Sequence, residues 1–347
     1  MTSDDESSAI EQSATEVAAS EPEDTSAILA HIAERLEAAK RVLITCHRGP
    51  DGDSVSTMIA LASLLRTHGT AVVLYNPDPV PRRLKWLPLT GGFNRKLTKK
   101  RIFDCTVVID CADTRMLGQI LPPPEVTGTI IVLDHHASGS RYGDIYLCDS
   151  RAASCGVLVA RLAAVLGWSL TQNAALGIYV SMCSDTGTFR YANTNAEALR
   201  LGAELLQSGI DPWLVSERLY ERQSLTRYKL LARLLDNIEM ALDGQVAIFV
   251  LTRDVLKEAG ASWEDSVGLV DYTRGLAGVE CGLLLSPAKR GGIRVSMRSK
   301  GDKVDAGALC ATMGGGGHRG AAGCVVEGDL ESARTHVLQV LAKALAD

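Results

Sequence analysis

Residues 41–53 read RVLITCHRGPDGD: an apolar run that favours a buried strand is followed at once by a histidine and two aspartates. Two later stretches, CTVVID at 105–110 and TIIVLDHHAS at 129–138, repeat the pattern of an apolar strand that ends in acidic or imidazole side chains. Helical patterns separate these strands, which is typical of a parallel sheet covered on both faces. The predicted fold class is therefore α/β. The carboxyl ends of parallel strands share one edge, so the polar residues of all three stretches should converge there.

Further elements extend from this sheet in both directions. Apolar residues at helical spacing predict helices at 28–40, 54–68 and about 330–346, and a mostly helical segment at 152–242. Further strands are predicted at 71–75, 246–251, 279–285 and 293–298. The chain has 347 residues, which suggests two domains. We expect a metal-carrying domain at 26–240 and a smaller α/β domain at 241–347, which begins near the turn signal of Asp243 and Gly244.

Residues 1–25 are acidic and of low complexity, which predicts a disordered tail. The formal net charge of the chain is −5, but residues 1–24 hold eight acidic residues and no Lys or Arg, so the rest carries +3. With 46% hydrophobic and 22% charged residues, the composition excludes a fibrous or wholly disordered protein. The acidity belongs largely to the tail, so net charge does not decide whether a nucleotide site exists.

The nine cysteines include no C-x-x-C pair, which favours free thiols in a reducing compartment over a disulfide framework or a zinc finger. The N-terminus lacks the basic start and apolar stretch of a signal peptide. No apolar run approaches the roughly 18 residues that a membrane span needs. We therefore expect a cytoplasmic protein without a membrane partner.

The candidate site consists of acidic and imidazole side chains at the ends of strands and helices. They are His47, Asp51, Asp53, Asp110, Asp134, His135, His136 and, in the stretch MCSDTGTF, Asp185. Taken singly, an aspartate such as Asp53 could cap a helix, and a loop histidine is usually solvated. Carboxylates that converge at one edge would repel one another, and two divalent cations would neutralise them while accepting neutral imidazoles as ligands. Their joint occurrence therefore favours a metal centre.

The second domain carries candidate anion-binding residues. The glycines at 314–317 can adopt positive φ and present backbone N–H groups to an anion, although a flexible turn would look the same. Arg294, Ser296, Arg298 and Lys300 alternate along one strand, so all four should point to one face. A row of cations suits phosphates, although a solvated edge strand would also show this pattern.

These motifs together resemble the DHH phosphoesterase superfamily. HRGPDGD, VVIDCADT, LDHHAS and SDTGTF are similar to its four motifs in order, and GGGGHRGAAG resembles the glycine-rich motif of the associated DHHA1 domain. The resemblance runs from about residue 40 to the C-terminus and is closest to the bacterial nanoRNase/pAp phosphatase subgroup. Ser54, Ser56 and Thr57 replace the more usual Ala, Gly and Ser, which affects fine packing in the first turn of a helix rather than metal binding.

The resemblance implies a role for each residue. One Mn²⁺ would be held by His47, Asp51 and Asp110, and a second by Asp53, Asp110, His135 and Asp185, with Asp110 bridging. Catalytic roles fall to His136, facing the scissile phosphate, and to Asp134, orienting the imidazoles. Substrate would be bound by Arg274, Arg298, Gly315, Gly316, Gly317 and His318. We expect Arg298 and His318 to lie outside the metal cluster.

The implied function is a Mn²⁺-dependent phosphohydrolase with its active site in the cleft between a DHH and a DHHA1 domain. Its substrates would be short single-stranded RNA or dinucleotides, cut to mononucleotides, and 3′-phosphoadenosine 5′-phosphate (pAp), cut to AMP; a homodimer is compatible with this. One alternative is a cyclic or linear dinucleotide phosphodiesterase with the same metal centre. Another is a nucleotide-binding regulator without catalysis, which the full set of six metal ligands disfavours. The ending GGGGHRGAAG disfavours a pyrophosphatase or exopolyphosphatase, and the chain length disfavours a DNA exonuclease with an added binding domain.

Overall fold

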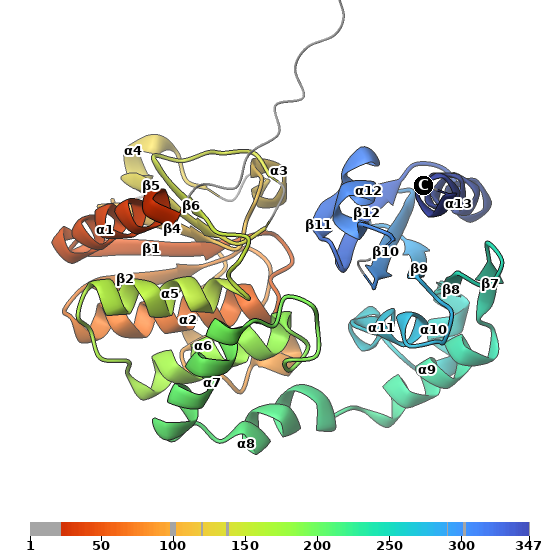
Figure 1. The fold of residues 1–347 in the computed structure, drawn as a ribbon, viewed down its shortest axis with the longest axis horizontal. Coiled ribbons are helices and arrows are strands. Elements are labelled where there is room, and N and C mark those ends of the chain that lie inside the picture. The colour runs from red at the N-terminus through yellow and green to blue at the C-terminus, as the bar shows by residue number, and fades with distance from the viewer. Residues whose placement is uncertain are drawn as a thin grey trace, which may run out of the picture.

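The computed structural model describes residues 22–97, 102–118, 121–136, 139–289, 291–300 and 303–346. It shows two α/β halves that face each other and are joined by a run of helices along one side (Figure 1). Among the described residues, no helix combines the length and apolar character that a membrane span requires. The predicted disordered tail lies mostly outside the described residues. Its last residues, from Pro22, instead form the first turn of a helix.

The first half is built on a six-stranded sheet in which every pair of neighbouring strands is parallel. The strand order is β3-β2-β1-β4-β5-β6. Their bounds are β1 Arg41–Cys46, β2 Ala71–Tyr75, β3 Phe93–Asn94, β4 Cys105–Ile109, β5 Thr129–Asp134 and β6 Ile145–Cys148. Cys46 is paired with Ile109, and Ile109 with Leu133, so the three strands that precede the candidate ligands end at one edge. The α/β class predicted for this half is confirmed.

Helices cover the two faces of this sheet unequally. The longer ones are α1 Pro22–Ala38, α2 Gly52–Thr67, α5 Cys155–Val165, α6 Gln172–Asp185 and α7 Ala196–Gln207. The shorter ones are η1 Arg82–Leu84, η2 Thr90–Gly92, α3 Thr114–Leu117 and α4 Pro124–Thr127. In β1, Val42 and Ile44 point into the large core beneath the long helices, whereas Leu43 points to a small cluster on the opposite face. The continuous apolar strands follow from this burial on both faces.

The connection and the second half continue the chain. The connecting helices are α8 Pro212–Ser216, η3 Glu217–Glu221 and α9 Leu225–Asp236. A second six-stranded sheet has the order β11-β12-β10-β9-β8-β7, in which only β8 and β9 are parallel. Its strands are β7 Glu239–Ala241, β8 Val246–Val250, β9 Cys281–Pro287, β10 Ile293–Ser299, β11 Gly316–His318 and β12 Ala321–Val326. Its helices are α10 Arg253–Ala259, η4 Trp263–Ser266, α11 Asp271–Arg274, α12 Ala306–Thr312 and α13 Leu330–Ala346.

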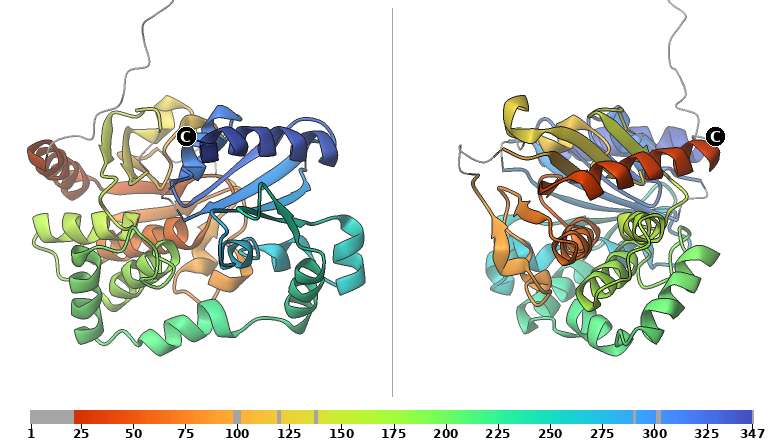
Figure 2. Two further views of the ribbon diagram at one scale, coloured as in Figure 1. Left: turned by 45° about the vertical axis from the view of Figure 1, so that its right-hand side comes forward. Right: turned by 90° about the vertical axis from the view of Figure 1, so that its left-hand side faces the viewer.

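The second sheet also has helices on both faces, as the rotated views show (Figure 2). Leucines of α9 pack on one face together with Phe249, so packing against this sheet begins upstream of the predicted boundary at residue 240. The alternation predicted for β10 is present, because Val295 and Met297 are buried while Arg298 lies on the other face. Arg298 pairs with Ala321, and Ala321 with His318. Arg298 and His318 therefore lie in one row on one face, turned toward α11.

A close backbone contact between two helices of the first half depends on a glycine. A Cβ atom at Gly177 of α6 would lie 2.5 Å from the carbonyl oxygen of Ser56 and 3.0 Å from the Cβ of Ala60, both in α2. Any side chain there would push α2 and α6 apart. Because α2 and α6 carry Asp53 and Asp185, the spacing of these helices also sets the spacing of two candidate ligands.

We predict that Gly177→Ala lowers the free energy of unfolding by about 1–3 kcal/mol, the usual cost of overpacking. Gly202→Ala is the matched control, since Gly202 also lies inside a helix but a Cβ there would meet Phe189 at an ordinary 3.5 Å. The control should be neutral or stabilising by up to about 1 kcal/mol from helix propensity. Denaturant unfolding of both variants tests this, and equal stabilities would contradict the argument.

Candidate metal centre

Three strands deliver their polar residues to the same edge of the first sheet. His47 directly follows β1, Asp110 follows β4, and His135 and His136 follow β5. The backbone N–H of Asp110 still donates to the carbonyl of Leu133 at 2.9 Å, so this residue is held by the sheet. Its φ of 56° lies in the left-handed region, which is uncommon outside glycine and is frequent at functional sites. The turn at Asp110 thus aims its carboxylate into the cluster.

The first turn of α2 supplies two further carboxylates. Asp51 caps this helix: its Oδ1 accepts from the backbone N–H of Ser54 at 3.0 Å and from the Ser54 hydroxyl at 2.9 Å. Asp53 is fully buried and accepts from Thr57 Oγ1 at 2.8 Å and from the backbone N–H of Cys155 at 2.8 Å. Two of the three residues that depart from the family pattern, Ser54 and Thr57, therefore donate hydrogen bonds to candidate ligands.

His135 lies at the centre of the first group of candidate ligands. Its Nε2 is 3.0 Å from Asp185 Oδ2, 3.4 Å from Asp53 Oδ2 and 3.8 Å from Asp110 Oδ1. Its Nδ1 is 3.0 Å from the carbonyl oxygen of Ala152, which can only accept, so Nδ1 carries a proton. A neutral His135 ring therefore points the lone pair of Nε2 at three carboxylates. A second proton on the ring, or a cation bound at this position, removes the repulsion between the Nε2 lone pair and the carboxylates.

His47 repeats the arrangement on the other side of Asp110. Its Nε2 is 3.5 Å from Asp110 Oδ2 and 3.8 Å from Asp51 Oδ1. Its Nδ1 donates to the carbonyl of Arg48 at 2.9 Å, which again leaves Nε2 directed at carboxylates. Asp110 is thus shared, with one oxygen toward His47 and the other toward His135. The fixed orientation of both rings is the arrangement that metal-binding histidines use.

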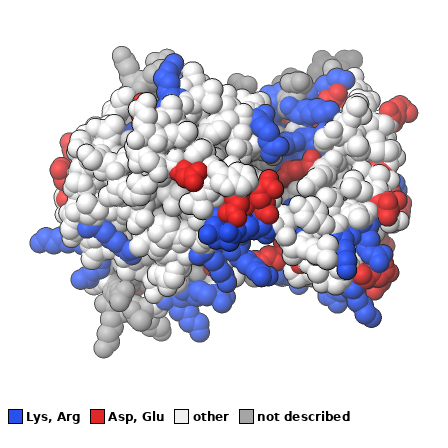
Figure 3. Space-filling view, turned by 90° about the horizontal axis from the view of Figure 1, so that it is seen from below, with Lys and Arg blue, Asp and Glu red and all other residues white. Residues whose placement is uncertain are grey.

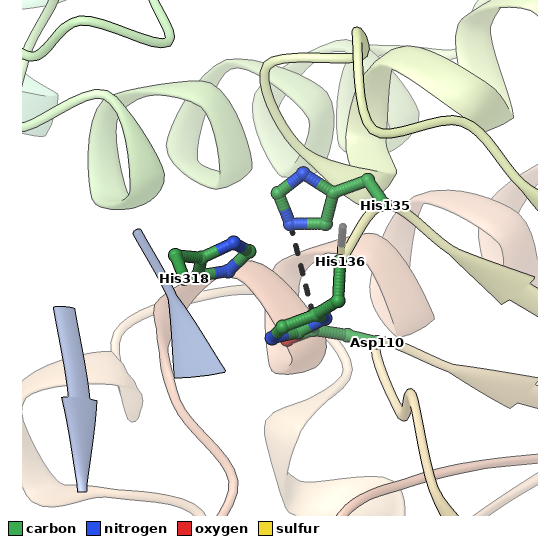
Figure 4. A group of neighbouring side chains, drawn as sticks. All are labelled: Asp110, His135, His136 and His318. Atoms are coloured by element: carbon green, nitrogen blue, oxygen red, sulfur yellow. Dashed lines mark ion pairs between the residues drawn. The ribbon is translucent and has the colours of Figure 1, made fainter. Parts of the chain in front are cut away.

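The third imidazole, His136, has a different partner. Its Nδ1 donates to Asp134 Oδ1 at 2.8 Å. The same nitrogen lies 3.5 Å from Oδ1 of Asp110, which Figure 4 shows beside it. His318, from β11 of the second domain, stacks on this ring with centroids 3.9 Å apart, and its Nε2 lies 3.7 Å from Asp185 Oδ2. The expectation that His318 lies outside the cluster was therefore wrong. Strand β11 closes directly on the candidate centre, which sequence spacing does not reveal.

The pKa values of the cluster residues show that the negative charges of the carboxylates are only partly compensated. Burial, together with the neighbouring Asp185 carboxylate, raises the pKa of Asp53 to about 6. Burial also raises the pKa of Asp110 and that of Asp185 above the usual range. Burial opposes protonation of His135, but attraction to the Asp185 carboxylate, whose Oδ2 lies 3.0 Å from Nε2, outweighs this and raises the pKa of His135 well above the usual value. The cluster therefore favours added positive charge.

The residues present fit a metal site. Three groups of side chains have ligand atoms within 4.8 Å of one another: Asp110, His135, His136 and His318; Asp53, Asp110, His135 and Cys155; His47, Asp51 and Asp110. Among the described residues, His135 Nε2 and Asp185 Oδ2 are buried without a hydrogen-bond partner. Oxygen and imidazole donors of this kind suit Mn²⁺, Mg²⁺ or Zn²⁺. Cys155 is a candidate ligand that sequence reasoning did not include.

Comparison with known proteins agrees with this geometry. Residues 41–205 match the DHH family, N-terminal domain, and residues 243–347 match the DHHA1 domain. The bifunctional oligoribonuclease and PAP phosphatase NrnA of Thermus thermophilus is 31% identical over 90% of this chain and 93% of that protein. The chain belongs to the DHH/DHHA1 phosphoesterase family. It is accordingly a phosphohydrolase, and members of this family depend on metal ions.

Two further DHH/DHHA1 relatives support the same assignment. The bifunctional oligoribonuclease and PAP phosphatase NrnA of Bacillus subtilis is 26% identical over 82% of this chain and 89% of its own. A crystal structure of an exopolyphosphatase-related protein from Bacteroides fragilis superimposes with a TM-score of 0.80 at 26% identity, over 92% of this chain and 96% of the other. The arrangement of both domains is therefore shared with a solved structure.

The predicted substrate residues of the DHHA1 domain lie in β10, in or next to β11, and at the end of α11. Arg298 Nε donates to Asp271 Oδ1 at 2.8 Å, and the guanidinium of Arg274 lies 4.5 Å from the ring centre of Tyr191 in the DHH domain. Gly315, Gly316 and Gly317 lead into and form β11, where a Cβ at Gly317 would press on Ala322 of β12. Sequence analysis missed Asp271 and Tyr191, although Tyr191 follows closely on the SDTGTF motif.

We predict that Asp110→Asn lowers the bound divalent metal by at least half, because one neutral amide replaces the carboxylate that both histidines share. Excess Mn²⁺ should raise the melting temperature of the wild type, since a ligand at a hundred times its Kd stabilises by about 2.7 kcal/mol. The variant should lose most of this gain. Asp254→Asn, an exposed carboxylate in α10, is the control. Elemental analysis and thermal melting test the prediction, and an unchanged metal-to-protein ratio would contradict it.

Proposed function

We propose that this chain is a Mn²⁺-dependent phosphohydrolase that degrades short oligoribonucleotides to mononucleotides and converts pAp to AMP. The observation that carries the proposal is the buried Asp/His cluster on which His318 of the DHHA1 domain closes. The names of the Thermus thermophilus and Bacillus subtilis relatives, which cover both domains, support this choice of substrates.

Two groups of residues would hold two cations. His47, Asp51 and Asp110 form one group, and Asp53, Asp110, His135 and Asp185 form the other. When bound, such a pair supplies Lewis-acid polarisation of a phosphoryl oxygen and a hydroxide nucleophile near neutral pH. The hydroxyls of Thr57 and Ser181 hold Asp53 in place: both donate to its Oδ1, Ser181 at 2.5 Å.

His136 is the proposed proton donor. Asp134 accepts from its Nδ1 at 2.8 Å and fixes the ring, so Nε2 is the nitrogen left to face a substrate. Burial opposes protonation of His136, but the charge and hydrogen bond of Asp134 outweigh it and raise the pKa of His136 above the usual value. A protonated His136 can give its proton to the leaving oxygen, the role of a general acid.

Arg298, Arg274 and the glycine segment are the proposed substrate contacts. They belong to the second domain, where Arg274 lies against Tyr191 of the DHH domain, whereas the acidic groups lie in the first domain. Among these groups, Arg298 offers a charge-assisted contact to a phosphate away from the bond that breaks. The enclosure of the cluster by His318 favours short flexible substrates over duplexes.

A substrate panel tests the proposal. With Mn²⁺ present, the protein should hydrolyse pAp and linear di- to pentanucleotides faster than cyclic dinucleotides or pyrophosphate. Preference for a cyclic dinucleotide would favour the related phosphodiesterase function. Tight nucleotide binding without turnover on any member of the panel would favour a regulator and would overturn the proposal.

We predict that His136→Ala keeps its metals while kcat falls by about 10²–10⁴, the range for a lost proton-transfer group. The metal ligands proposed above do not include this residue, so metal content should match that of the wild type. His336→Ala, on the exposed side of α13, is the control and should have normal kcat. Loss of a metal ion in His136→Ala would show that His136 is a ligand instead.

We predict that Arg298→Ala raises KM at least tenfold, or about 1.4 kcal/mol, with unchanged metal content. His318→Ala should also lower kcat, because its ring packs on His136 rather than on a remote subsite. Arg294→Ala is the matched control, since Arg294 is an exposed arginine on the same face of the same strand. Steady-state kinetics on a dinucleotide check these values, and an equal effect of Arg294→Ala would refute a specific role for Arg298.

A further inference from the structure

A pocket of about 520 Å³ lies at the seam between the two domains, on the side of the connecting helices. We call it the seam pocket. Its walls include Thr188 and Arg190 after α6, Tyr220, Gln223 and Tyr228 of the connecting segment, and Tyr272 of α11. Seen from that side, the surface is hollowed between the two halves, and Lys and Arg gather there with a few acids (Figure 3). The volume falls within the usual range for small-molecule sites.

The walls combine aromatic rings with guanidinium groups that are held in place. The side chains of Tyr228 and Tyr272 are exposed, at 53% and 48%. Arg227, which also lines the pocket, donates from Nη1 to the carbonyls of Asp265 at 2.5 Å and Val267 at 2.8 Å. Arg190 donates from Nε to the carbonyl of Gly187 at 2.6 Å. These hydrogen bonds hold both guanidinium groups in place. They leave the positive charges unneutralised, because each acceptor is an uncharged carbonyl.

Exposed tyrosines beside arginines are the groups that bind single-stranded nucleic acid. Bases stack on aromatic faces and on guanidinium planes, and arginines bind phosphate oxygens. The carboxylate of Glu221, also in the wall, can accept from the exocyclic amino group of a base. The chemistry of the pocket therefore fits one nucleotide better than an apolar ligand.

The seam pocket also lies close to residues of the candidate metal centre along the chain. Thr188 follows Asp185 by three residues, and three residues span at most about 11 Å even when fully extended. The hydroxyl of Tyr220 donates to the carbonyl of Cys183, at 3.2 Å, in the last turns of the helix that carries Asp185. On the other wall, Tyr272 shares the short helix α11 with Asp271, the partner of Arg298. A substrate that reaches both Asp185 and Arg298 therefore passes beside this pocket.

We propose that the seam pocket binds the base and phosphate of a nucleotide beyond the scissile phosphate of an oligoribonucleotide. This inference rests on the proposed function. It divides the proposed substrates into those that reach the seam pocket and those that do not. A trinucleotide is long enough to occupy the metal centre and the seam pocket together. The single nucleotide pAp fills the metal centre and leaves the pocket without a contact.

The test uses the full-length protein and three variants. Tyr228→Ala should weaken the binding of a hydrolysis-resistant phosphorothioate trinucleotide by about fivefold to a hundredfold, the range for one lost base–tyrosine stack. Tyr228→Phe keeps the ring and should bind within twofold of the wild type. Trp213→Ala removes an aromatic side chain of α8 that is also exposed but lies outside the pocket walls, and it should change nothing. Calorimetry gives the four dissociation constants.

Hydrolysis separates this inference from the proposed function. In Tyr228→Ala the KM for the trinucleotide should rise by the same factor, while kcat/KM for pAp stays within twofold and shows that the variant is folded. Equal losses on both substrates, or unchanged trinucleotide binding, would overturn the role of the seam pocket. A wild type that hydrolyses neither substrate would instead overturn the proposed function, and the binding measurement would still decide the role of the pocket.

Discussion

The mutual repulsion of buried carboxylates is the constraint on which the rest of the structure depends. Asp53, Asp110 and Asp134 are buried at one edge of a sheet, and Asp185 joins them from the end of α6. Like charges in a medium of low polarity repel far more strongly than in water. The fold holds them together with three imidazoles, backbone N–H groups and hydroxyls, and the raised pKa values of Asp53, Asp110 and Asp185 show that this compensation is incomplete. A cluster of this kind is a stable design only for a centre that receives cations.

The need to hold these carboxylates in place also determines how α2 packs against α6 in the core. Asp53 lies in the first turn of α2, and Ser181 of α6 donates to it, so the two helices cooperate on one carboxylate. Ser181 also accepts from the backbone N–H of Gly156 at the start of α5. Three helices thus converge on a single buried charge. Because these helices must approach one another closely, the residues where they meet are small, as Gly177 is.

Sequence predicted the first domain better than the second, for a physical reason. Apolar strands of a parallel sheet are buried on both faces, so β1, β2, β4 and β5 stand out as uninterrupted runs, each predicted within one residue at either end. Strands β6 and β12 were missed because each alternates between buried and partly exposed residues, with Tyr146 or glycine in place of an aliphatic run. The metal-ligand candidates were predicted because each follows a recognisable strand or helix. The position of His318 against His136 was not, because it depends on how two separate domains dock.

That docking separates the charges of the site between the domains. The acidic groups belong to the first domain, whereas Arg274 and Arg298 belong to the second, where Arg274 lies against Tyr191 of the first domain and Arg298 pairs with Asp271. His318 lies between the two sets: burial, together with the neighbouring His136 and His135, lowers its pKa well below the usual value, so it stacks on His136 as a neutral ring. A phosphate is attracted by the arginines but repelled by the carboxylates until their charge is balanced. Under the proposed function, cations would therefore bind the first domain before a phosphate approaches Asp110 and Asp185.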